Sequence, residues 1–162
     1  MRDDSGLTVH RGQVLAEWID ANGHMNVAWY GLVFDQAVDA LWERIGHDPD
    51  YRQQHRSTTF AAESHSRYLK EIGDGETFVV QTRIVDMDER RVHQFQQLYA
   101  DSDSRLVATC EWMHLHVSLA TRRVSAWPAD IYDQLAMLAR EQRDWPAPDG
   151  LAASIGMRRS ST

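Results

Sequence analysis

The stretch from Asp20 to Asn26 (Asp-Ala-Asn-Gly-His-Met-Asn) gathers polar side chains around a single glycine. A polar loop that leads into the N-terminus of a buried helix presents backbone N–H donors to an oxygen on which negative charge develops. Asp20, His24 and Asn26 are residue types that can activate or hold a water molecule. This combination favours acyl transfer to water, so we predict a hydrolase.

The same residues also fit a purely structural interpretation. Asp20-Ala-Asn-Gly23 is typical of a turn, and Asn26 is a good N-cap for the helix pattern that follows. Single motifs often match by chance, so the local sequence leaves both interpretations open.

The elements around the loop follow from the spacing of apolar residues. From Val27 to about Ile45 they recur every three or four positions, which predicts a helix that ends at Gly46. Strands are predicted within residues 8–18 and near 57–70, 77–87, 91–100 and 105–118, with a loop at 47–50 and a last helix over about 128–142 that has Pro128 in its first turn. This order predicts an α+β domain in which an antiparallel sheet wraps against one long helix.

Length and composition indicate one globular domain. The chain has 162 residues (18.6 kDa), 43% of them hydrophobic and 25% charged, which suits a single core. We expect the domain to span residues 1–145 and the tail 146–162 to be loosely held. A free strand edge in such a sheet predicts a homodimer or homotetramer.

Charge and cysteine content exclude several classes of function. A net charge of −7 argues against nucleic-acid binding, which needs a basic face. Cys110 is the single cysteine, so no intramolecular disulfide can form. No signal peptide and no apolar run of about 18 residues is visible, and we expect a cytoplasmic protein that does not bind membranes.

The Asp20–Asn26 block and the order of elements together resemble the hotdog-fold acyl-CoA thioesterases of the 4-hydroxybenzoyl-CoA thioesterase type. The chain looks most like the subgroup that includes the betainyl-CoA thioesterases of carnitine degradation. The match continues in the residues 27–30, 63–73 and 108–116. The resemblance implies a hotdog fold and hydrolysis of a small acyl-CoA, such as betainyl-CoA, without a cofactor.

The resemblance also implies roles for residues of the loop. Asp20 matches the catalytic carboxylate, acting as nucleophile or as general base through water. A helix-start N–H in the region of Asn26 to Ala28 would polarise the thioester carbonyl, and His24 and Asn26 would orient water and substrate. The residues expected to bind the acyl group are Asn22, Gly23, Val27, Trp29, Tyr30, His65 and Tyr68.

Two further carboxylates compete for a place in the site. Glu63 lies in a partly apolar strand and is expected either as a second carboxylate of the pocket, with His65 on the same face, or in a cross-strand ion pair. Asp35 is a rival to Asp20 on the central helix. We favour a solvated acidic stripe for Asp35, because it shares one helix face with Asp39 and Glu43.

Aromatic and basic residues suggest how substrate binds. Trp29 and Tyr68, with Glu63, could surround a trimethylammonium group, although tryptophan more often packs in cores. The candidates for the CoA phosphates are Arg90, Arg91, Arg122 and Arg123, each of which could also be an ordinary surface arginine. His114 and His116 lack an evident third ligand, so we predict no metal site.

Two other functions remain as alternatives. A hotdog-fold enoyl-thioester hydratase or dehydratase is disfavoured because the loop lacks a Gly-Asp-x-Asn-Pro-x-His string. A non-catalytic acyl-CoA-binding module is disfavoured because Asp20 would repel an anionic ligand.

Overall fold

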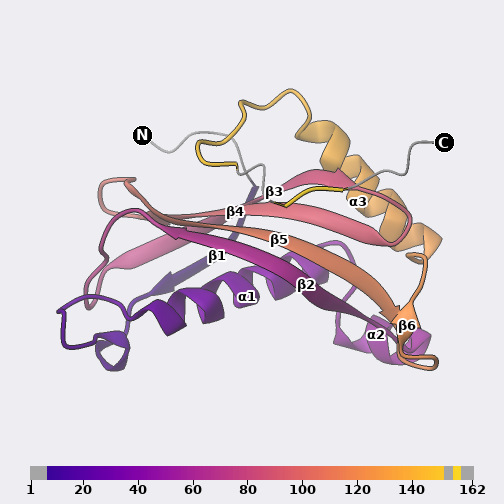
Figure 1. Ribbon diagram of the computed structural model, residues 1–162, viewed down its shortest axis with the longest axis horizontal. Coiled ribbons are helices and arrows are strands. Elements are labelled where there is room, and N and C mark those ends of the chain that lie inside the picture. The colour runs from indigo at the N-terminus through magenta and orange to yellow at the C-terminus, as the bar shows by residue number, and fades with distance from the viewer. Residues whose placement is uncertain (1–6, 152–154, 158–162) are drawn as a thin grey trace.

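The computed structural model describes residues 7–151 and 155–157. A long helix, α1 (Val27–Arg44), lies along one face of a curled antiparallel sheet (Figure 1). The strands are β1 (Leu7–Gln13), β2 (Ser57–Tyr68), β3 (Thr77–Met87), β4 (Arg91–Ala100), β5 (Leu106–Ser118) and β6 (Arg123–Val124), in the order β1-β3-β4-β5-β2 with β6 paired to β5. The other helices are α2 (Pro49–His55), α3 (Ala129–Glu141) and a 3-10 turn at Ala16–Trp18. This arrangement confirms the predicted α+β class.

Some predicted boundaries were wrong, for local reasons. The first strand ends at Gln13, because the 3-10 turn follows it before the loop. Pro49 and Asp50 begin α2 instead of a loop, since Asp48 caps that helix by accepting a hydrogen bond from Tyr51 N–H (2.8 Å). Pro128 is the N-cap of α3 and does not lie in its first turn. The two-residue strand β6 was not predicted.

The core lies between α1 and the sheet. The buried stripe of α1 consists of Tyr30, Val33, Phe34, Ala37, Val38, Leu41 and Trp42, as the spacing predicts. The first half of the stripe, up to Ala37, packs with Leu98 of β4 and with Ala108 and Cys110 of β5. The second half packs with Ile84 of β3, Val92 of β4 and the apolar side of α3. Burying a side chain such as Phe34 stabilises the fold by about 1.5–3 kcal/mol, so this stripe fixes α1, and with it the loop before α1, against the sheet.

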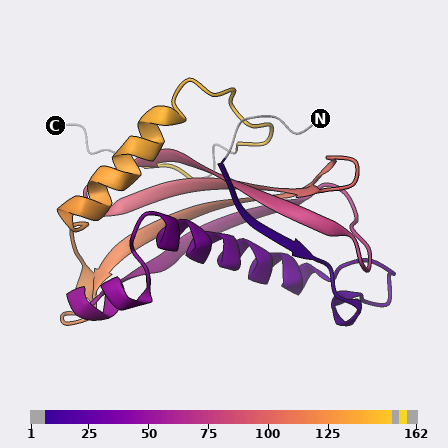
Figure 2. The same cartoon turned by 180° about the vertical axis from the view of Figure 1, so that it is seen from behind.

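The chain that follows α3 covers part of the opposite, outer face of the sheet (Figure 2). Side chains alternate between the two faces of a strand, so His93 and Glu111 point away from α1, where they form a buried pair (Nε2 to Oε1, 2.7 Å). After α3 the chain returns over this face (Figure 2). Arg83 holds it there by donating hydrogen bonds to the carbonyls of Trp145 (3.1 Å) and Pro146. Of the predicted tail, residues 152–154 and 158–162 lie outside the described residues.

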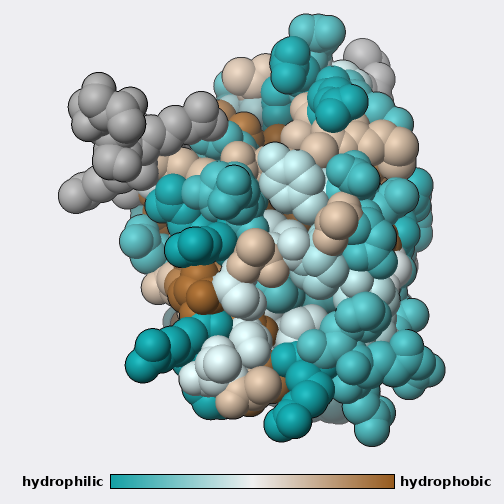
Figure 3. Space-filling model, turned by 90° about the vertical axis from the view of Figure 1, so that its right-hand side faces the viewer, coloured by the Kyte–Doolittle hydropathy of each residue, from teal (hydrophilic) through white to brown (hydrophobic). Residues whose placement is uncertain are grey.

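The two ends of the molecule differ in character. The Asp20–Asn26 loop lies at one end of α1, while α2 and β6 lie at the other (Figures 1 and 2). The surface at the α2 and β6 end is mainly hydrophilic (Figure 3). Beneath it, His47, His114 and His116 are buried against Trp42 and Trp127, with ring centroids 4.8–6.1 Å apart.

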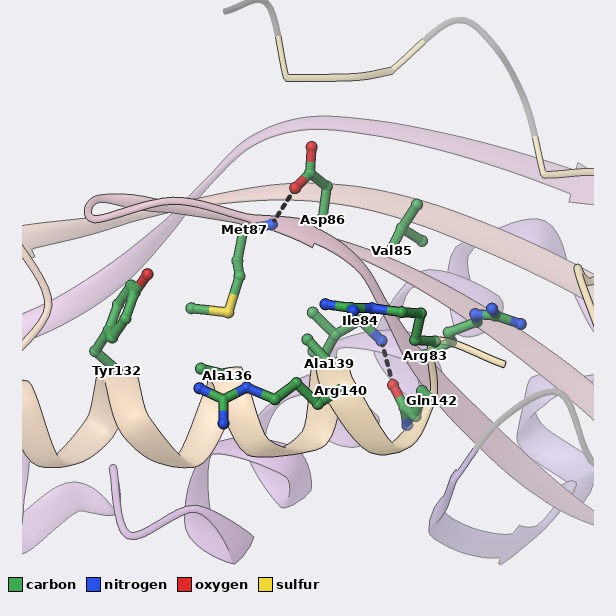
Figure 4. A pocket seen from close by; sticks show the side chains of 11 residues that line it. Arg83, Ile84, Val85, Asp86, Met87, Tyr132, Ala136, Ala139, Arg140 and Gln142 are labelled. Carbon is green, nitrogen blue, oxygen red and sulfur yellow. Dashed lines mark hydrogen bonds between the residues drawn. The ribbon is translucent and has the colours of Figure 1, made fainter. Parts of the chain in front are cut away.

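The β3 edge is closed where β1 stops pairing with it. The last β1–β3 partner is Thr82, opposite Leu7. Beyond it, Gln142 at the end of α3 accepts a hydrogen bond from Ile84 N–H (2.7 Å) and donates one to the Thr82 carbonyl (3.3 Å), as Figure 4 shows for Ile84. One side-chain amide thus takes the place of a strand residue.

The buried histidines predict a loss of stability in acid. Burial lowers the pKa of His47 and of His114 from 6.5 to about 4. The unfolded chain therefore takes up protons near pH 6.5 while the folded chain resists them down to about pH 4. The stabilisation is complete above pH 6.5 and is lost as the pH falls toward 4, by about 1–2 kcal/mol at pH 5 for His114.

Thermal melts from pH 7.5 to 4.5 test this effect. Because His114 Nδ1 has no hydrogen-bond partner among the described residues, His114→Phe should fold and should show a smaller decrease in Tm with acid than the wild type. The exposed His55 serves as the control, and His55→Gln should keep the wild-type slope. Equal slopes in all three proteins would contradict this origin of the pH dependence.

Candidate active site

A tight turn shapes the loop before α1. Gly23 N–H donates to the Asp20 carbonyl (3.0 Å) and Asp20 N–H donates to the His24 carbonyl (3.2 Å), while Ile19 and Met25 form an isolated bridge. Gly23 has φ of +84°, a backbone conformation that is unfavourable in free energy for residues that have a Cβ. The turn expected from the sequence therefore forms, and it holds Asp20 near the helix start.

Two hydrogen bonds orient the Asp20 carboxylate. Asn22 N–H donates to Oδ1 (2.8 Å) and the Asn26 amide Nδ2–H donates to Oδ2 (2.9 Å). The bond from the Asn22 backbone, followed by the bond from Asn26, lowers the pKa of Asp20 below its usual 3.8. The carboxylate is consequently ionised and fixed in direction at neutral pH.

One backbone amide at the start of α1 stays free. Asn26 N–H donates to the Trp18 carbonyl (2.9 Å), Ala28 N–H to Asn26 Oδ1 (3.0 Å) and Trp29 N–H to the Asn26 carbonyl (3.0 Å). Val27 N–H makes no hydrogen bond to any residue that the structure describes. Of the amides in the region of Asn26 to Ala28, Val27 N–H is therefore the one able to bind a substrate oxygen.

A pocket of about 340 Å³ opens beside this amide. Its lining residues are His24, Met25, Val27, Tyr30, Tyr68, Leu69, Lys70 and Glu71. The rings of Tyr30 and Tyr68 meet edge to face with centroids 5.2 Å apart. Burial, with smaller contributions from Tyr68 and Glu71, raises the pKa of Tyr30 to about 12. His24 Nε2 lies 3.8 Å from Glu71 Oε1 at the rim.

The segment after β2 is braced against the loop. Met25 N–H donates to the Ile72 carbonyl (2.9 Å). Arg105 donates to the Glu71 carbonyl (3.1 Å) and to both oxygens of Glu76 (2.7 and 2.9 Å). These bonds fix the wall of the pocket that carries Leu69, Lys70 and Glu71. These three pocket residues were not predicted from the sequence, although they directly follow Tyr68, which was predicted to bind substrate.

Other predicted substrate-binding residues lie outside this pocket. Trp29 stacks on Trp18 at 5.2 Å between ring centroids, and the backbone N–H of Asn22 donates its hydrogen bond to Asp20.

Glu63 and His65 are exposed on β2. Their partners on β5 are Met113 and Glu111, so both side chains lie on the sheet face opposite to that of Tyr68. Within one chain the structure therefore brings together His24, Val27, Tyr30 and Tyr68, and leaves Glu63 and His65 apart from them.

Asp35 lies on an exposed face of α1. Burial, followed by the charge of Asp39, raises its pKa. Asp39 in turn lies 3.8 Å from Arg52. Asp35 is not among the residues that line the pocket, which supports the interpretation as an acidic surface stripe.

The predicted CoA-binding arginines gather at the far end of the sheet. Arg90 and Arg91 line a pocket of about 580 Å³ together with Leu115 and Val124. Arg91 is paired with Asp88 (2.6 Å). Arg122 lies over the Phe60 ring, and Arg123 belongs to β6. Strand β6, whose Val124 lines this pocket with Arg90 and Arg91, lies at the opposite end of α1 from the Asp20 loop (Figure 1).

A third pocket, of about 440 Å³, lies between β3 and α3 (Figure 4) and, like the pocket lined by Arg90 and Arg91, is larger than the one beside Val27 N–H. It contains no residue of the Asp20 loop. Two of its polar side chains already have partners, because Arg83 binds the carbonyls of the returning chain and Asp86 accepts from Met87 N–H (2.8 Å). The position of the catalytic candidates, and not pocket size, therefore identifies the site.

The part of the chain that the structure describes contains neither a metal-binding cluster nor a membrane-spanning helix. No three His, Cys, Asp or Glu side chains there lie close enough to hold a metal ion. No helix there is long and apolar enough to cross a membrane.

Two substitutions of Asn26 should separate its contribution to stability from its contribution to activity. Asn26→Ala removes both the cap and the bond to Asp20, and should lower the free energy of unfolding by about 0.5–2 kcal/mol as well as the turnover. Asn26→Ser keeps a capping oxygen but cannot reach Asp20 with an amide, so its Tm should stay near that of the wild type while turnover decreases. Equal turnover in Asn26→Ser and wild type would refute the orienting role.

The chain is similar in sequence to known thioesterases. Residues 14–135 match the family model described as Thioesterase-like superfamily. A betainyl-CoA thioesterase of Pseudomonas aeruginosa is 35% identical over 93% of this chain and 95% of its own length. An L-carnitine dehydrogenase/betainyl-CoA thioesterase of Agrobacterium fabrum is 35% identical over 94% of this chain, which spans 31% of that protein.

Solved structures give the same result. A Staphylococcus aureus protein determined in complex with CoA has a TM-score of 0.86 at 31% identity and covers 98% of both chains. A putative thioesterase from Pseudomonas putida has a TM-score of 0.79 at 32% identity, over 95% of this chain and 98% of its own. The fold is therefore the predicted hotdog fold, and the chain belongs to the thioesterase-like superfamily.

Proposed function

We propose that this protein hydrolyses a small acyl-CoA to the free acid and CoA at the Asp20 loop. The observation that carries the proposal is the pairing of an oriented, ionised carboxylate with a free helix-start amide, on either side of Asn26 and next to a pocket. Thioester hydrolysis needs these two elements: a group that activates water and a donor for the carbonyl oxygen.

The reaction follows from this geometry. Val27 N–H donates a hydrogen bond to the thioester carbonyl, whose oxygen gains negative charge as a nucleophile adds to the carbon. Asp20 accepts a proton from the attacking water, and His24 orients that water or the substrate. The C–S bond then breaks, and the departing thiolate of CoA takes up the proton. A covalent route, in which Asp20 itself attacks the carbonyl, uses the same residues.

Betainyl-CoA is the substrate that we propose. The support is the P. aeruginosa relative, which is a betainyl-CoA thioesterase and aligns over nearly its whole length. The CoA complex of the S. aureus protein supports CoA as the leaving group. A cytoplasmic location and the absence of any cofactor are parts of the same proposal.

A complete site is proposed to need two copies of the chain. Strand β2 ends the sheet, has twelve residues, and exposes eight of them. Its Tyr68 end lies at the pocket, and its Ser57 end pairs with Ser118, which also pairs with Arg123. Antiparallel pairing of two β2 edges about a two-fold axis would bring the arginine end of one copy to the Asp20 end of the other.

Replacement of Asp20 tests the chemistry. Asp20→Asn should keep the fold but lower kcat at least about a hundredfold, the scale for losing a positioned general base. Release of free thiol from acyl-CoA is the measurement. Asp35→Asn is the matched control and should stay within about twofold of the wild type. Near-normal activity of Asp20→Asn would move the catalytic role to Glu63 or Asp35.

Mixing two impaired variants tests the shared site. We expect at least a dimer in light scattering at micromolar concentration. When Asp20→Asn is co-expressed with the double variant Arg122→Ala/Arg123→Ala, random pairing restores one intact site in each mixed dimer, so about a quarter of the wild-type kcat/KM should return. An active monomer, or mixed dimers without recovery, would exclude a site built from both copies.

A further inference from the structure

We infer that Tyr30, Tyr68 and Glu71 form the part of the pocket that selects a positively charged acyl group. This inference rests on the proposed function and names the side chains that would recognise the substrate. None of the three is a reacting group, so they set specificity and not the chemistry of hydrolysis.

Covalent geometry limits where the charge can be. In a betainyl thioester the quaternary nitrogen is separated from the carbonyl carbon by a single CH₂ group, at a distance of about 2.5 Å, as in a peptide N–Cα–C unit. With the carbonyl oxygen on Val27 N–H, the cation must sit within about one helical turn of that amide. Tyr30 is three residues after Val27 on α1, and such residues are neighbours on a helix surface. Both residues line the pocket.

The aromatic surface for the cation comes from the tyrosine pair. Tyr30 is buried (4% exposed) and fixed in the core, whereas Tyr68 is 51% exposed. The rings meet at 68° with centroids 5.2 Å apart, so together they form a corner in the pocket wall. A quaternary ammonium ion within about 6 Å of an aromatic ring centroid is attracted by the ring quadrupole.

The Glu71 carboxylate, at the rim of the same pocket, has the negative charge that attracts a cationic acyl group. The Glu71 side chain is 79% exposed and points toward His24 (3.8 Å) at the pocket rim. Its negative charge acts on Tyr30, where it contributes to the raised pKa of the phenol. Arg105, which donates to the Glu71 carbonyl, is already paired with Glu76 and Asp103. Lys70, the only lysine in the sequence, is the basic residue of the lining.

This assignment differs from the one that the sequence suggested. Tyr68 is common to both. Trp29 is stacked on Trp18, and Glu63 lies on the other face of β2. Within one chain, Tyr30 and Glu71 take the positions that had been assigned to Trp29 and Glu63.

The test compares two substrates that differ only in charge. Betainyl-CoA and 3,3-dimethylbutyryl-CoA have the same shape, since a quaternary carbon replaces the quaternary nitrogen. The wild type should hydrolyse both and prefer betainyl-CoA in kcat/KM. Tyr68→Leu should reduce the betainyl to dimethylbutyryl ratio by about two- to thirtyfold, and Glu71→Gln, which removes an exposed charge, by about two- to fivefold. In both variants the loss should be mainly on the charged substrate.

Matched variants separate recognition from folding and net charge. Tyr68→Phe keeps the ring and should keep the ratio. Glu43→Gln changes the net charge by the same amount as Glu71→Gln, on the exposed far end of α1, and should also keep it. Lys70→Gln removes the opposing charge and should hold or raise the ratio.

The outcomes distinguish this inference from the proposed function. If the wild type cleaves both thioesters without preference, or if Glu71→Gln and Tyr68→Leu leave the ratio within twofold, the cation-selecting role is wrong and the thioesterase assignment survives. If no thiol is released from either substrate or from a panel of short acyl-CoAs, the proposed function fails and this inference fails with it.

Discussion

The side chain of Asn26 is the point on which both the fold and the site depend. Its Oδ1 accepts from Ala28 N–H and so begins α1, while its Nδ2 donates to Asp20. Because the same amide satisfies both groups, the direction of the helix axis and the direction of the carboxylate are set together. Val27 lies between these two contacts, and its N–H, the proposed donor to the thioester carbonyl, makes no hydrogen bond to a residue that the structure describes. The structural and the catalytic interpretations of this loop are therefore two descriptions of one arrangement.

The core extends this coupling across the sheet. The buried stripe of α1 fixes the helix against β4 and β5, and Met25 is tied to the Ile72 carbonyl on the far side of the pocket. Arg105 then holds the Glu71 backbone and Glu76 in place. A change at any of these supports would move the pocket wall relative to Val27 N–H without touching a reacting group, and small displacements are costly for positioned groups.

Much of this could be predicted from the sequence, and the limits have physical causes. The spacing of apolar residues and the positions of turn residues predicted α1 and the four long strands, because each of these elements buries one face. The helix α2 had visible signals, Asp48 as cap and Pro49 at the first position, but its short length and lack of buried residues hid it.

The site was harder to predict than the elements. The sequence does not show the irregular pairing between Ala61 and Glu63. From Glu63 to Tyr68, however, the pairing is regular, so the alternation of side chains along a strand, which is visible in the sequence, already places Glu63 and His65 on the face opposite to that of Tyr68. Leu69, Lys70 and Glu71 come after a strand, where no periodicity marks them.

Gln142 limits which edge of the sheet can pair with a strand from another copy. One edge of the sheet is the short strand β1, which carries an irregularity between Thr8 and His10, and the β3 segment beyond it is closed by the Gln142 amide. The other edge, β2, is long and open. Two copies that joined along β2, as proposed, would use up the only long row of free backbone groups that the described strands offer, and the short β1 edge would give a third copy little to pair with. A single glutamine at the end of α3 thus helps to protect the molecule from self-polymerisation.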